Sequence, residues 1–175
     1  SIHKSKGLEF PMVFVSGLGK LFNQQDARAS LVIHPDLGIG ADWIDTKRRT
    51  KAPTLLKKAV QRQIQLENLG EELRVLYVAL TRAKEKLYLT GAVSKLEKRL
   101  EGLEMVKNEE ETRLSYGKLV KARMYLDWIF PALARHSCMD GLYQQYDYSC
   151  PVSHPLHEEN APFLITVKSP VEFVL

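Results

Sequence analysis

A long helical pattern between two short strand-like runs restricts the fold of this chain more than any other feature. Apolar residues recur every three or four positions from Leu56 to Leu80, and this spacing predicts helix. Gly70 lies inside the pattern and is expected to break or bend it, so two helices and one interrupted helix are both compatible with the sequence. Residues 75–80 are apolar without interruption, which is typical of a buried helix.

The flanking runs have the composition of strands. Residues 11–17 precede the helical pattern and residues 86–92 follow it, and both are rich in apolar residues and close on Gly. A further candidate strand, residues 31–34, is followed by proline and glycine, which predicts a short hairpin or a turn-rich excursion. The order strand, excursion, buried helix and strand predicts an α/β layer with a mostly parallel sheet, in which residues 11–17 form a buried strand.

The rest of the chain has weaker patterns. Residues 94–104 predict a short charged helix, and residues 115–136 predict a longer one with an apolar side. Residues 140–160 are polar and contain two prolines, so they predict a loop or linker. Residues 163–167 are a last candidate strand.

Composition excludes several classes of protein. The chain has 175 residues, of which 45% are hydrophobic and 26% charged, and this balance is typical of one globular domain with a modest appendage. Its longest apolar run, residues 75–80, is too short to span a bilayer, and no secretion signal opens the chain. We therefore expect a cytoplasmic protein with no membrane partner, in which Cys138 and Cys150 are reduced thiols.

Charge is unevenly distributed although the net charge is only +4. Residues 47–62 contain seven basic side chains and no acidic one, whereas residues 101–111 contain five glutamates and one lysine. A basic stretch can follow a phosphate backbone. A solvated loop and helix face is the simpler explanation, and charge alone favours it.

Common catalytic and metal-binding motifs are absent. The sequence has no P-loop pattern, and Gly38-Ile39-Gly40 lacks the third glycine of a dinucleotide fingerprint. His154 and His157 lie in a proline-containing stretch, which favours a surface loop over a metal site. The sequence predicts no metal site.

Two segments nevertheless concentrate groups that can bind anions. Residues 1–10 contain hydroxyl, imidazole and ammonium groups before Gly7, and Glu9 follows. Residues 71–86 form a predicted helix that presents Arg82 at its end, and a helix positions a side chain more accurately than a loop does. Taken singly, each segment is also explained by local ion pairs, namely Glu9 with Lys4 or Lys6, Arg82 with Glu85, and Arg74 with Glu71.

Taken together, the two segments resemble a known family. SIHKSKGLEFP at residues 1–11 resembles motif V, and EELRVLYVALTRAKEKL at residues 71–87 resembles motif VI, of superfamily 1 helicases of the UvrD/Rep type. Both motifs are long and specific, and they occur in the order of the family. The chain further resembles the AddA (RexA) family of bacterial helicase–nuclease subunits, over roughly residues 1–136, in GLGK at 17–20, HPDLGIG at 34–40 and YLDWI at 125–129.

This resemblance implies a domain organisation. Residues 1–93 would be the C-terminal half of the second RecA-like (P-loop NTPase-type) helicase domain, residues 94–138 a helical extension, and residues 139–175 a linker and the start of a following region. The chain begins with Ser-Ile-His and no methionine, so we expect a fragment of a longer protein. The P-loop and the Mg²⁺-binding acids would precede it, and a nuclease domain would follow it.

The resemblance also implies roles for six residues. Ser1, His3 and Lys4 would contact DNA, Gly7 and Glu9 would face the nucleotide, and Arg82 would be the catalytic arginine finger at the γ-phosphate.

At the level of the whole protein, the resemblance implies an ATP-dependent 3′–5′ DNA helicase with an exonuclease. The parent would use ATP and Mg²⁺, act on single- and double-stranded DNA in double-strand break repair and recombination, and pair with an AddB-type (RexB) subunit. We expect the fragment alone to be inactive and to hold no cofactor.

Three alternatives remain open from the sequence. A non-catalytic nucleic-acid-binding module would depend on residues 47–62, and a subunit-assembly module would depend on residues 115–136, with Trp128 and Phe130 at a partner. A third alternative is a degenerate helicase relative that never hydrolyses ATP. A P-loop in the full open reading frame would separate it from an active helicase.

Overall fold

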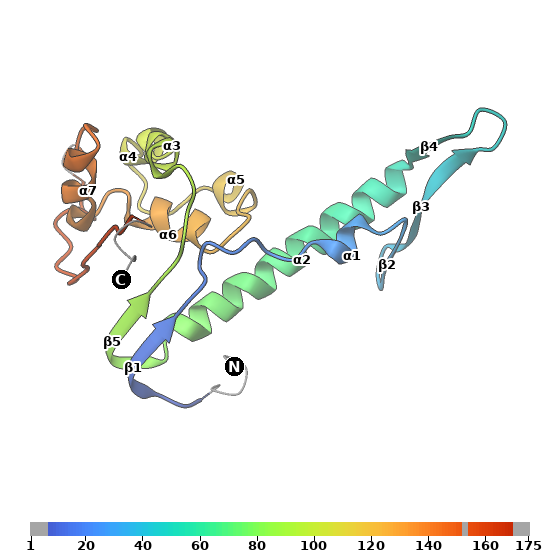
Figure 1. Cartoon of the computed structure of the whole chain (residues 1–175). Coiled ribbons are helices and arrows are strands. Elements are labelled where there is room, and N and C mark those ends of the chain that lie inside the picture. Colours follow the sequence, from blue (N-terminus) through green and yellow to red (C-terminus); the bar gives the residue numbers. More distant parts are fainter. Residues whose placement is uncertain (1–6, 152–153, 170–175) are drawn as a thin grey trace. The chain divides into compact units, whose positions relative to one another are not determined.

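The computed structural model describes residues 7–151 and 154–169, and it divides into two compact units (Figure 1). One unit comprises residues up to Gly91 together with Ala122–Met124, and the other comprises Ala92–Lys121 and the residues from Tyr125 onwards. The first contains β1 (Phe10–Val15), α1 (Gln25–Arg28), β2 (Leu31–His34), β3 (Gly38–Asp45), β4 (Thr50–Pro53), α2 (Leu55–Leu80) and β5 (Ala83–Leu89). The second contains α3 (Leu96–Glu101), α4 (Glu104–Lys107), α5 (Tyr116–Leu119), α6 (Leu126–Leu133), the 3₁₀ turn η2 (Ser137–Met139) and α7 (Asp140–Gln145). The division into domains at residues 93 and 138 stays a prediction.

β1 and β5 pair in parallel, with Phe10 opposite Ala83 and Val15 opposite Leu89. The register shifts between Phe10 and Met12, at Pro11, which has no N–H to donate to the ladder. Parallel strands require a crossover connection, and α2 forms the last part of it (Figure 1). The predicted α/β class with a parallel sheet is therefore confirmed. Among the described strands, parallel pairing is confined to β1 and β5.

α2 is one uninterrupted helix of 26 residues. The hydroxyl of Thr54 accepts a hydrogen bond from the amide of Lys57, 3.2 Å away, and so caps the N-terminus. The helix continues through Gly70, so the expected break is wrong. A single interior glycine costs about 1 kcal/mol, which the hydrogen bonds and packing of a long helix outweigh.

The complete burial expected for β1 and for the second half of α2 is also wrong in this chain. Leu76 and Ala79 are buried, but Tyr77 is 68% exposed on the same helix, and Phe14 of β1 is 67% exposed. A strand is buried on both faces only when layers cover both sides of its sheet. The described sheet of β1 and β5 has just two strands, so its apolar residues keep much of their surface.

The excursion between β1 and α2 is an antiparallel sheet with the order β2-β3-β4. The predicted strand at residues 31–34 and the hairpin after it are confirmed, and β4 extends the sheet. Val32 and Gly40 face the first half of α2, and a Cβ at Gly40 would lie 2.6 Å from the Cα of Lys57. Glycine is therefore required at position 40 by close packing of the strand on the helix.

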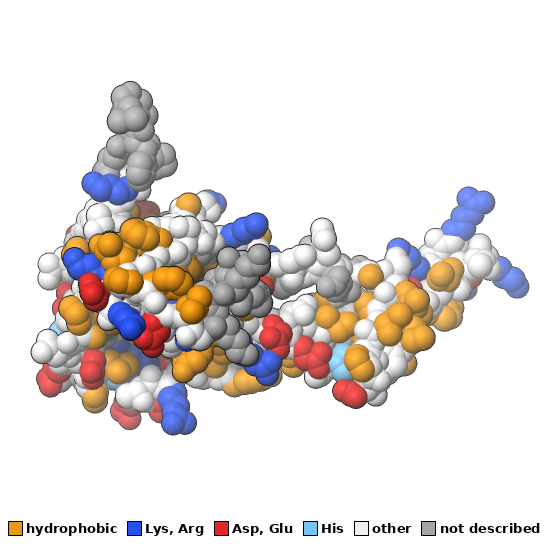
Figure 2. All heavy atoms as spheres, turned by 90° about the horizontal axis from the view of Figure 1, so that it is seen from below, with side chains coloured by type: hydrophobic (Ala, Val, Ile, Leu, Met, Phe, Trp, Pro, Cys, Tyr) orange, Lys and Arg blue, Asp and Glu red, His pale blue; other side chains and the backbone are white. Residues whose placement is uncertain are grey.

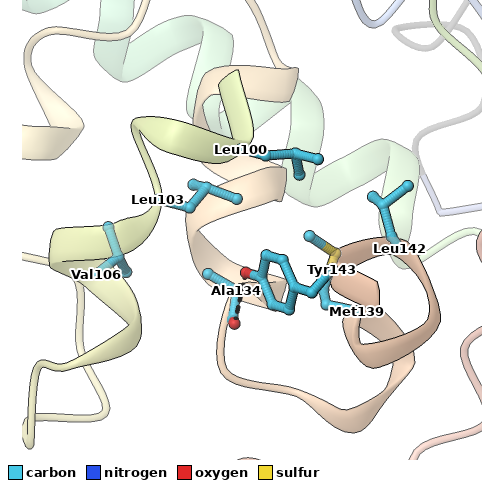
Figure 3. Packing of buried hydrophobic residues seen from close by; sticks show 7 residues of the cluster. All are labelled: Leu100, Leu103, Val106, Ala134, Met139, Leu142 and Tyr143. Atoms are coloured by element: carbon cyan, nitrogen blue, oxygen red, sulfur yellow. Dashed lines mark hydrogen bonds between the residues drawn. The ribbon is translucent and has the colours of Figure 1, made fainter. Parts of the chain in front are cut away.

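The second unit has a core of its own, drawn in Figure 3. The core residues come from α3, α4, η2 and α7 and from the end of α6 and its C-cap, and they are Leu100, Leu103, Val106, Ala134, Met139, Leu142 and Tyr143. The buried hydroxyl of Tyr143 donates a hydrogen bond of 2.8 Å to the carbonyl of Ala134. This bond satisfies the one polar group of an otherwise apolar side chain.

Three predictions for this unit are wrong. Residues 115–136 form the two short helices α5 and α6, because the chain between them leaves the unit at Ala122–Met124. Residues 140–145 form α7 where polar composition predicts a loop, since Leu142 and Tyr143 are drawn into the core. Residues 163–167 pair with no described strand, although Ile165 packs against the core.

Buried charge explains why the polar C-terminal stretch is ordered. Arg135 is fully buried and donates hydrogen bonds to the carbonyls of Glu109, Glu111 and Thr112. His154 is also buried, with its Nε2 3.2 Å from the carbonyl of Glu110, so the expectation of a surface loop there is wrong. A buried cation is tolerated only when protein acceptors replace its water, and backbone carbonyls do so here.

Two glycine substitutions test this packing in opposite directions. Gly40→Ala should lower the free energy of unfolding by about 1–3 kcal/mol, because the added methyl group meets the backbone of α2. Gly70→Ala should raise it by about 0.5–1 kcal/mol, because the site is open and alanine favours helix. Urea denaturation of the 175-residue chain measures both. A stabilising Gly40→Ala would contradict the close contact of β3 with α2.

Candidate functional site

The two segments that the sequence singles out meet where β1 and β5 begin. The amide of Phe10 donates a hydrogen bond of 2.9 Å to the carbonyl of Arg82, immediately before the parallel pairing starts. The guanidinium of Arg82 reaches the carbonyl of Leu8, 74 positions away in the sequence. The structure thus brings Gly7, Glu9 and Arg82 to one end of the parallel pair. Ser1, His3 and Lys4 lie outside the described residues.

Gly7 turns the chain into β1. Its φ angle is +83°, and no atom lies within 4 Å of the position that a Cβ would take. The requirement for glycine is therefore conformational, since other residues rarely adopt this φ. The turn leaves the peptide groups around Gly7 without side-chain cover, as anion-binding loops require.

Protein acceptors hold the Arg82 guanidinium on three sides. Its Nε donates to the carbonyl of Val78 at 3.0 Å, Nη1 to the carbonyl of Leu8 at 3.2 Å, and Nη2 to the hydroxyl of Thr81 at 3.1 Å. The carbonyl end of α2 also favours a cation by the helix dipole. Arg82 has five N–H groups, and these three contacts leave one on each Nη for a further acceptor among the described surroundings.

Thr81 sets the position of the guanidinium. Its hydroxyl lies 2.9 Å from the carbonyl of Tyr77, to which it donates, and it accepts the hydrogen bond from Arg82. The sequence analysis did not single out this residue. Its signal is the position next to Arg82 at the end of a helix, where threonine can bond back to the preceding turn.

Glu9 forms an ion pair that the sequence analysis did not predict. Its Oε2 lies 3.2 Å from Nζ of Lys84, the second residue of β5, and both side chains are more than half exposed. Such a pair contributes about 0–1 kcal/mol, so the carboxylate can exchange its partner at little cost. The signal was the parallel register, since Phe10 opposite Ala83 places Glu9 and Lys84 close together. The expected ion pair of Arg74 with Glu71 is confirmed.

This site combines a fixed cation with an exposed carboxylate. The open N–H groups of Arg82 suit a phosphate oxygen, and Glu9 suits a sugar hydroxyl, so both fit a nucleotide. Mg²⁺ requires clustered oxygen ligands. The described part of the chain has no group of three or more His, Cys, Asp or Glu side chains placed to hold a metal ion, so a magnesium site does not fit these residues.

The basic stretch of residues 47–62 is divided by the fold. Lys57 is only 5% exposed, and its Nζ binds the carboxylate of Asp42 at 2.8 Å and the carbonyl of Ser30 at 2.9 Å. Lys57 is therefore part of the packing of α2 on the antiparallel sheet. The other six basic residues are at least partly exposed, namely Lys47, Arg48, Arg49, Lys51, Lys58 and Arg62.

Other side chains named in the sequence analysis have structural partners or are free. Trp128 is 5% exposed and donates from Nε1 to the carbonyl of Leu119, so it is not presented to a partner protein as the assembly alternative supposes. Cys138 and Cys150 are both free thiols, as predicted. No helix in residues 7–151 or 154–169 is long and apolar enough to cross a membrane.

Comparisons with known proteins identify close relatives. The family described as "UvrD-like helicase C-terminal domain" matches residues 1–94. The AddA subunit of the ATP-dependent helicase/nuclease of Clostridium perfringens is 50% identical over 143 residues, which is 81% of this chain and 11% of the relative. The protein of the same name in Acetivibrio thermocellus is 49% identical over 142 residues, with the same coverage. The chain thus spans 11% of the length of these relatives.

The hydrogen bonds of Arg82 should be measurable in the stability of the chain. Arg82→Ala should lower the free energy of unfolding by about 1–2 kcal/mol, because it removes three hydrogen bonds that join Leu8 to the end of α2. Lys84→Ala is the control and should change it by about 0.5 kcal/mol or less, since its ion pair is exposed. Urea denaturation measures both, and equal effects would refute the anchoring of Arg82.

Proposed function

The chain belongs to the family of UvrD-like helicase C-terminal domains, and we propose that it supplies the arginine finger and part of the nucleotide and DNA contacts of an AddA-type helicase/nuclease. One observation carries the proposal. The Arg82 guanidinium is held at the end of α2, beside the segment of Gly7 and Glu9, with two N–H groups left for a ligand.

In the proposed mechanism, Arg82 binds the γ-phosphate of ATP when the neighbouring motor domain closes. ATP supplies the phosphoryl group whose transfer to water releases the free energy of hydrolysis. The guanidinium is planar and permanently charged, so it stabilises the negative charge that develops on the transferred group. The hydrogen bonds to Val78, Leu8 and Thr81 orient it in advance, which reduces the reorganisation needed at the moment of reaction.

Glu9 and Gly7 serve the nucleotide in this proposal. The Glu9 carboxylate accepts a hydrogen bond from a ribose hydroxyl, and the ion pair with Lys84 keeps it close to β5 until then. The backbone at Gly7 allows close approach to the nucleotide because no side chain covers it.

DNA contacts fall to the segment that precedes Gly7. Ser1, His3 and Lys4 would donate hydrogen bonds or present positive charge to the phosphate backbone, as the likeness to motif V implies. This segment continues directly into Gly7 and Glu9, so one short stretch of chain would touch both DNA and nucleotide. That continuity would couple the nucleotide state to the grip on DNA.

The proposal for the whole protein follows the relatives. The parent would be an ATP-dependent 3′–5′ DNA helicase with exonuclease activity, acting in double-strand break repair and recombination with an AddB-type (RexB) subunit. Its Mg²⁺ would be held by residues outside the described part of this chain, which has no matching cluster. Names of the relatives support the helicase and nuclease activities of the parent.

Arg82→Ala in the intact helicase/nuclease tests the arginine finger. ATP turnover should fall by about 10³–10⁵ because the developing charge loses its guanidinium, while ATP binding is largely retained. Arg82→Lys should remain strongly impaired, since an ammonium group cannot reproduce the planar fork. Single-turnover hydrolysis and nucleotide titration measure the two effects.

Arg74→Ala is the matched control for that experiment. Arg74 lies on the same helix, is exposed, and pairs with Glu71, so its loss should leave turnover within about twofold. A thermal melt of each variant separates a lost catalytic group from a lost fold. Near wild-type turnover by a folded Arg82→Ala enzyme would refute the assignment.

The 175-residue chain alone should hydrolyse no ATP in the presence of single-stranded DNA. It offers an arginine finger and nucleotide contacts, but its described residues include no cluster that could hold Mg²⁺ beside the phosphates. A phosphate-release assay with chain purified from a helicase-deficient host measures this. Robust DNA-stimulated turnover that co-purifies with the chain would contradict the proposal.

A further inference from the structure

The hairpin of β3 and β4 has a well-formed tip that consists almost entirely of basic residues. Asp45, the last residue of β3, accepts hydrogen bonds from the amides of Lys47 at 2.9 Å and Arg48 at 3.0 Å through one carboxylate oxygen. Arg49 completes the turn with a φ angle of +51°. Lys51 follows in β4, so four exposed cations lie within five positions. We call Lys47, Arg48, Arg49 and Lys51 the basic tip.

The charge of the basic tip is largely uncompensated by nearby acids. Asp45 is committed to the turn, and its second oxygen is 4.0 Å from Nε of Arg48, whose side chain remains 85% exposed. Asp42, the other acid of β3, pairs with the buried Lys57. The hairpin extends beyond the start of α2 (Figure 1), and Figure 2 shows Lys and Arg side chains at the end of this arm. Such a charge distribution complements an anionic polymer.

An exposed aromatic ring lies on the sheet beside the basic tip. Trp43 is 57% exposed and lies two positions before Asp45, with Ala52 of β4 opposite it. The small side chain of Ala52 leaves the neighbouring surface of the sheet low. Ile33 and Ile39, also exposed and paired opposite each other, continue the same apolar face (Figure 2). Figure 2 shows hydrophobic side chains over this sheet.

We propose that this hairpin is a binding site for single-stranded DNA, in which the basic tip contacts phosphates and Trp43 stacks on a base. Cationic side chains next to an exposed aromatic ring are the usual means of binding single strands without sequence preference. A duplex would leave the Trp43 ring unused, because its bases are already stacked on one another. The proposal goes beyond the proposed function, since it involves none of Ser1, His3, Lys4 or Arg82.

Salt dependence tests the phosphate contacts. The tip variant combines Lys47→Gln, Arg48→Gln, Lys51→Gln and Arg49→Asn, the last because asparagine tolerates the positive φ angle. Anisotropy of a labelled oligothymidine, titrated with the 175-residue chain at several salt concentrations, gives the slope of log K against log salt. Each phosphate contact on a single strand contributes about −0.7, so losing four should make the slope shallower by about 3.

A matched control separates the hairpin from net charge. Lys95→Asn, Lys98→Gln, Arg113→Gln and Lys121→Gln remove the same four charges from exposed positions elsewhere, so that both variants fall from +4 to 0. Circular dichroism confirms that each variant is folded. The control should keep most of the wild-type slope. An equal loss in both variants, or an unchanged slope in the tip variant, overturns the proposal.

Substitution of Trp43 tests stacking. Trp43→Ala should weaken oligothymidine binding by about tenfold, whereas Trp43→Phe should retain most of the affinity and Ile39→Ala should have little effect. Because the other tryptophan, Trp128, is buried, quenching of tryptophan fluorescence by oligothymidine should disappear in Trp43→Phe.

A blunt-ended duplex of the same length serves as the competing ligand. Duplex binding that equals single-strand binding, with no effect of Trp43→Ala, would overturn the single-strand assignment. Dimerisation or protein association that depends on Ile39 in place of DNA binding would overturn it as well. Residual salt dependence in the tip variant reports on residues 1–6, so failure here leaves the proposed DNA contacts of Ser1, His3 and Lys4 separately testable.

Discussion

The parallel pairing of β1 with β5 is the constraint on which the first unit depends. Two parallel strands cannot be joined by a tight turn, so the chain between them must travel away and return. The return path is α2, and its last residue is followed at once by Thr81 and Arg82. Strand entry therefore places the segment of Gly7 and Glu9 beside the end of that helix. A site made from residues far apart in the sequence follows from this one pairing.

α2 does two different jobs along its length. Its first half supports the antiparallel sheet through close contact at Gly40 and the buried pair of Lys57 with Asp42. Its second half ends in the carbonyls and hydroxyl that hold Arg82. A buried ion pair is weak as a source of stability but costly to break, because either partner left alone is an unsatisfied charge. Lys57 thus gives the hairpin a defined seat on the helix.

The second unit combines an apolar core with buried cations. Arg135 binds three backbone carbonyls, and Lys107 binds Glu104 and the carbonyl of Ser149 with its Nζ 4.5 Å from the ring centre of Tyr143. Burial, together with the nearby charge of Glu104, raises the pKa of the Tyr143 hydroxyl, so this group stays protonated and donates to Ala134. These polar contacts hold segments whose composition is that of a loop.

Prediction from the sequence succeeded where the signal is local and periodic. The spacing of apolar residues located α2, the apolar runs located β1, β2 and β5, and the order of these elements indicated a parallel sheet. Prediction failed at Gly70, at residues 115–136 and at residues 140–160. In each case the outcome depends on packing against distant residues, which outweighs the propensity of a single glycine, the periodicity of an apolar side or the polarity of a stretch.

The candidate site divides in the same way. The sequence by itself determined which chemical groups are available, since Gly7, Glu9 and Arg82 stand in motifs whose residue types suit a nucleotide. Only the tertiary structure decided that Arg82 bonds to Leu8 and Thr81, that Glu9 pairs with Lys84, and that Lys57 is withdrawn from the basic stretch. Residue identity sets charge and hydrogen-bonding capacity, whereas strand register and burial set which groups can reach one another and which remain open to a ligand.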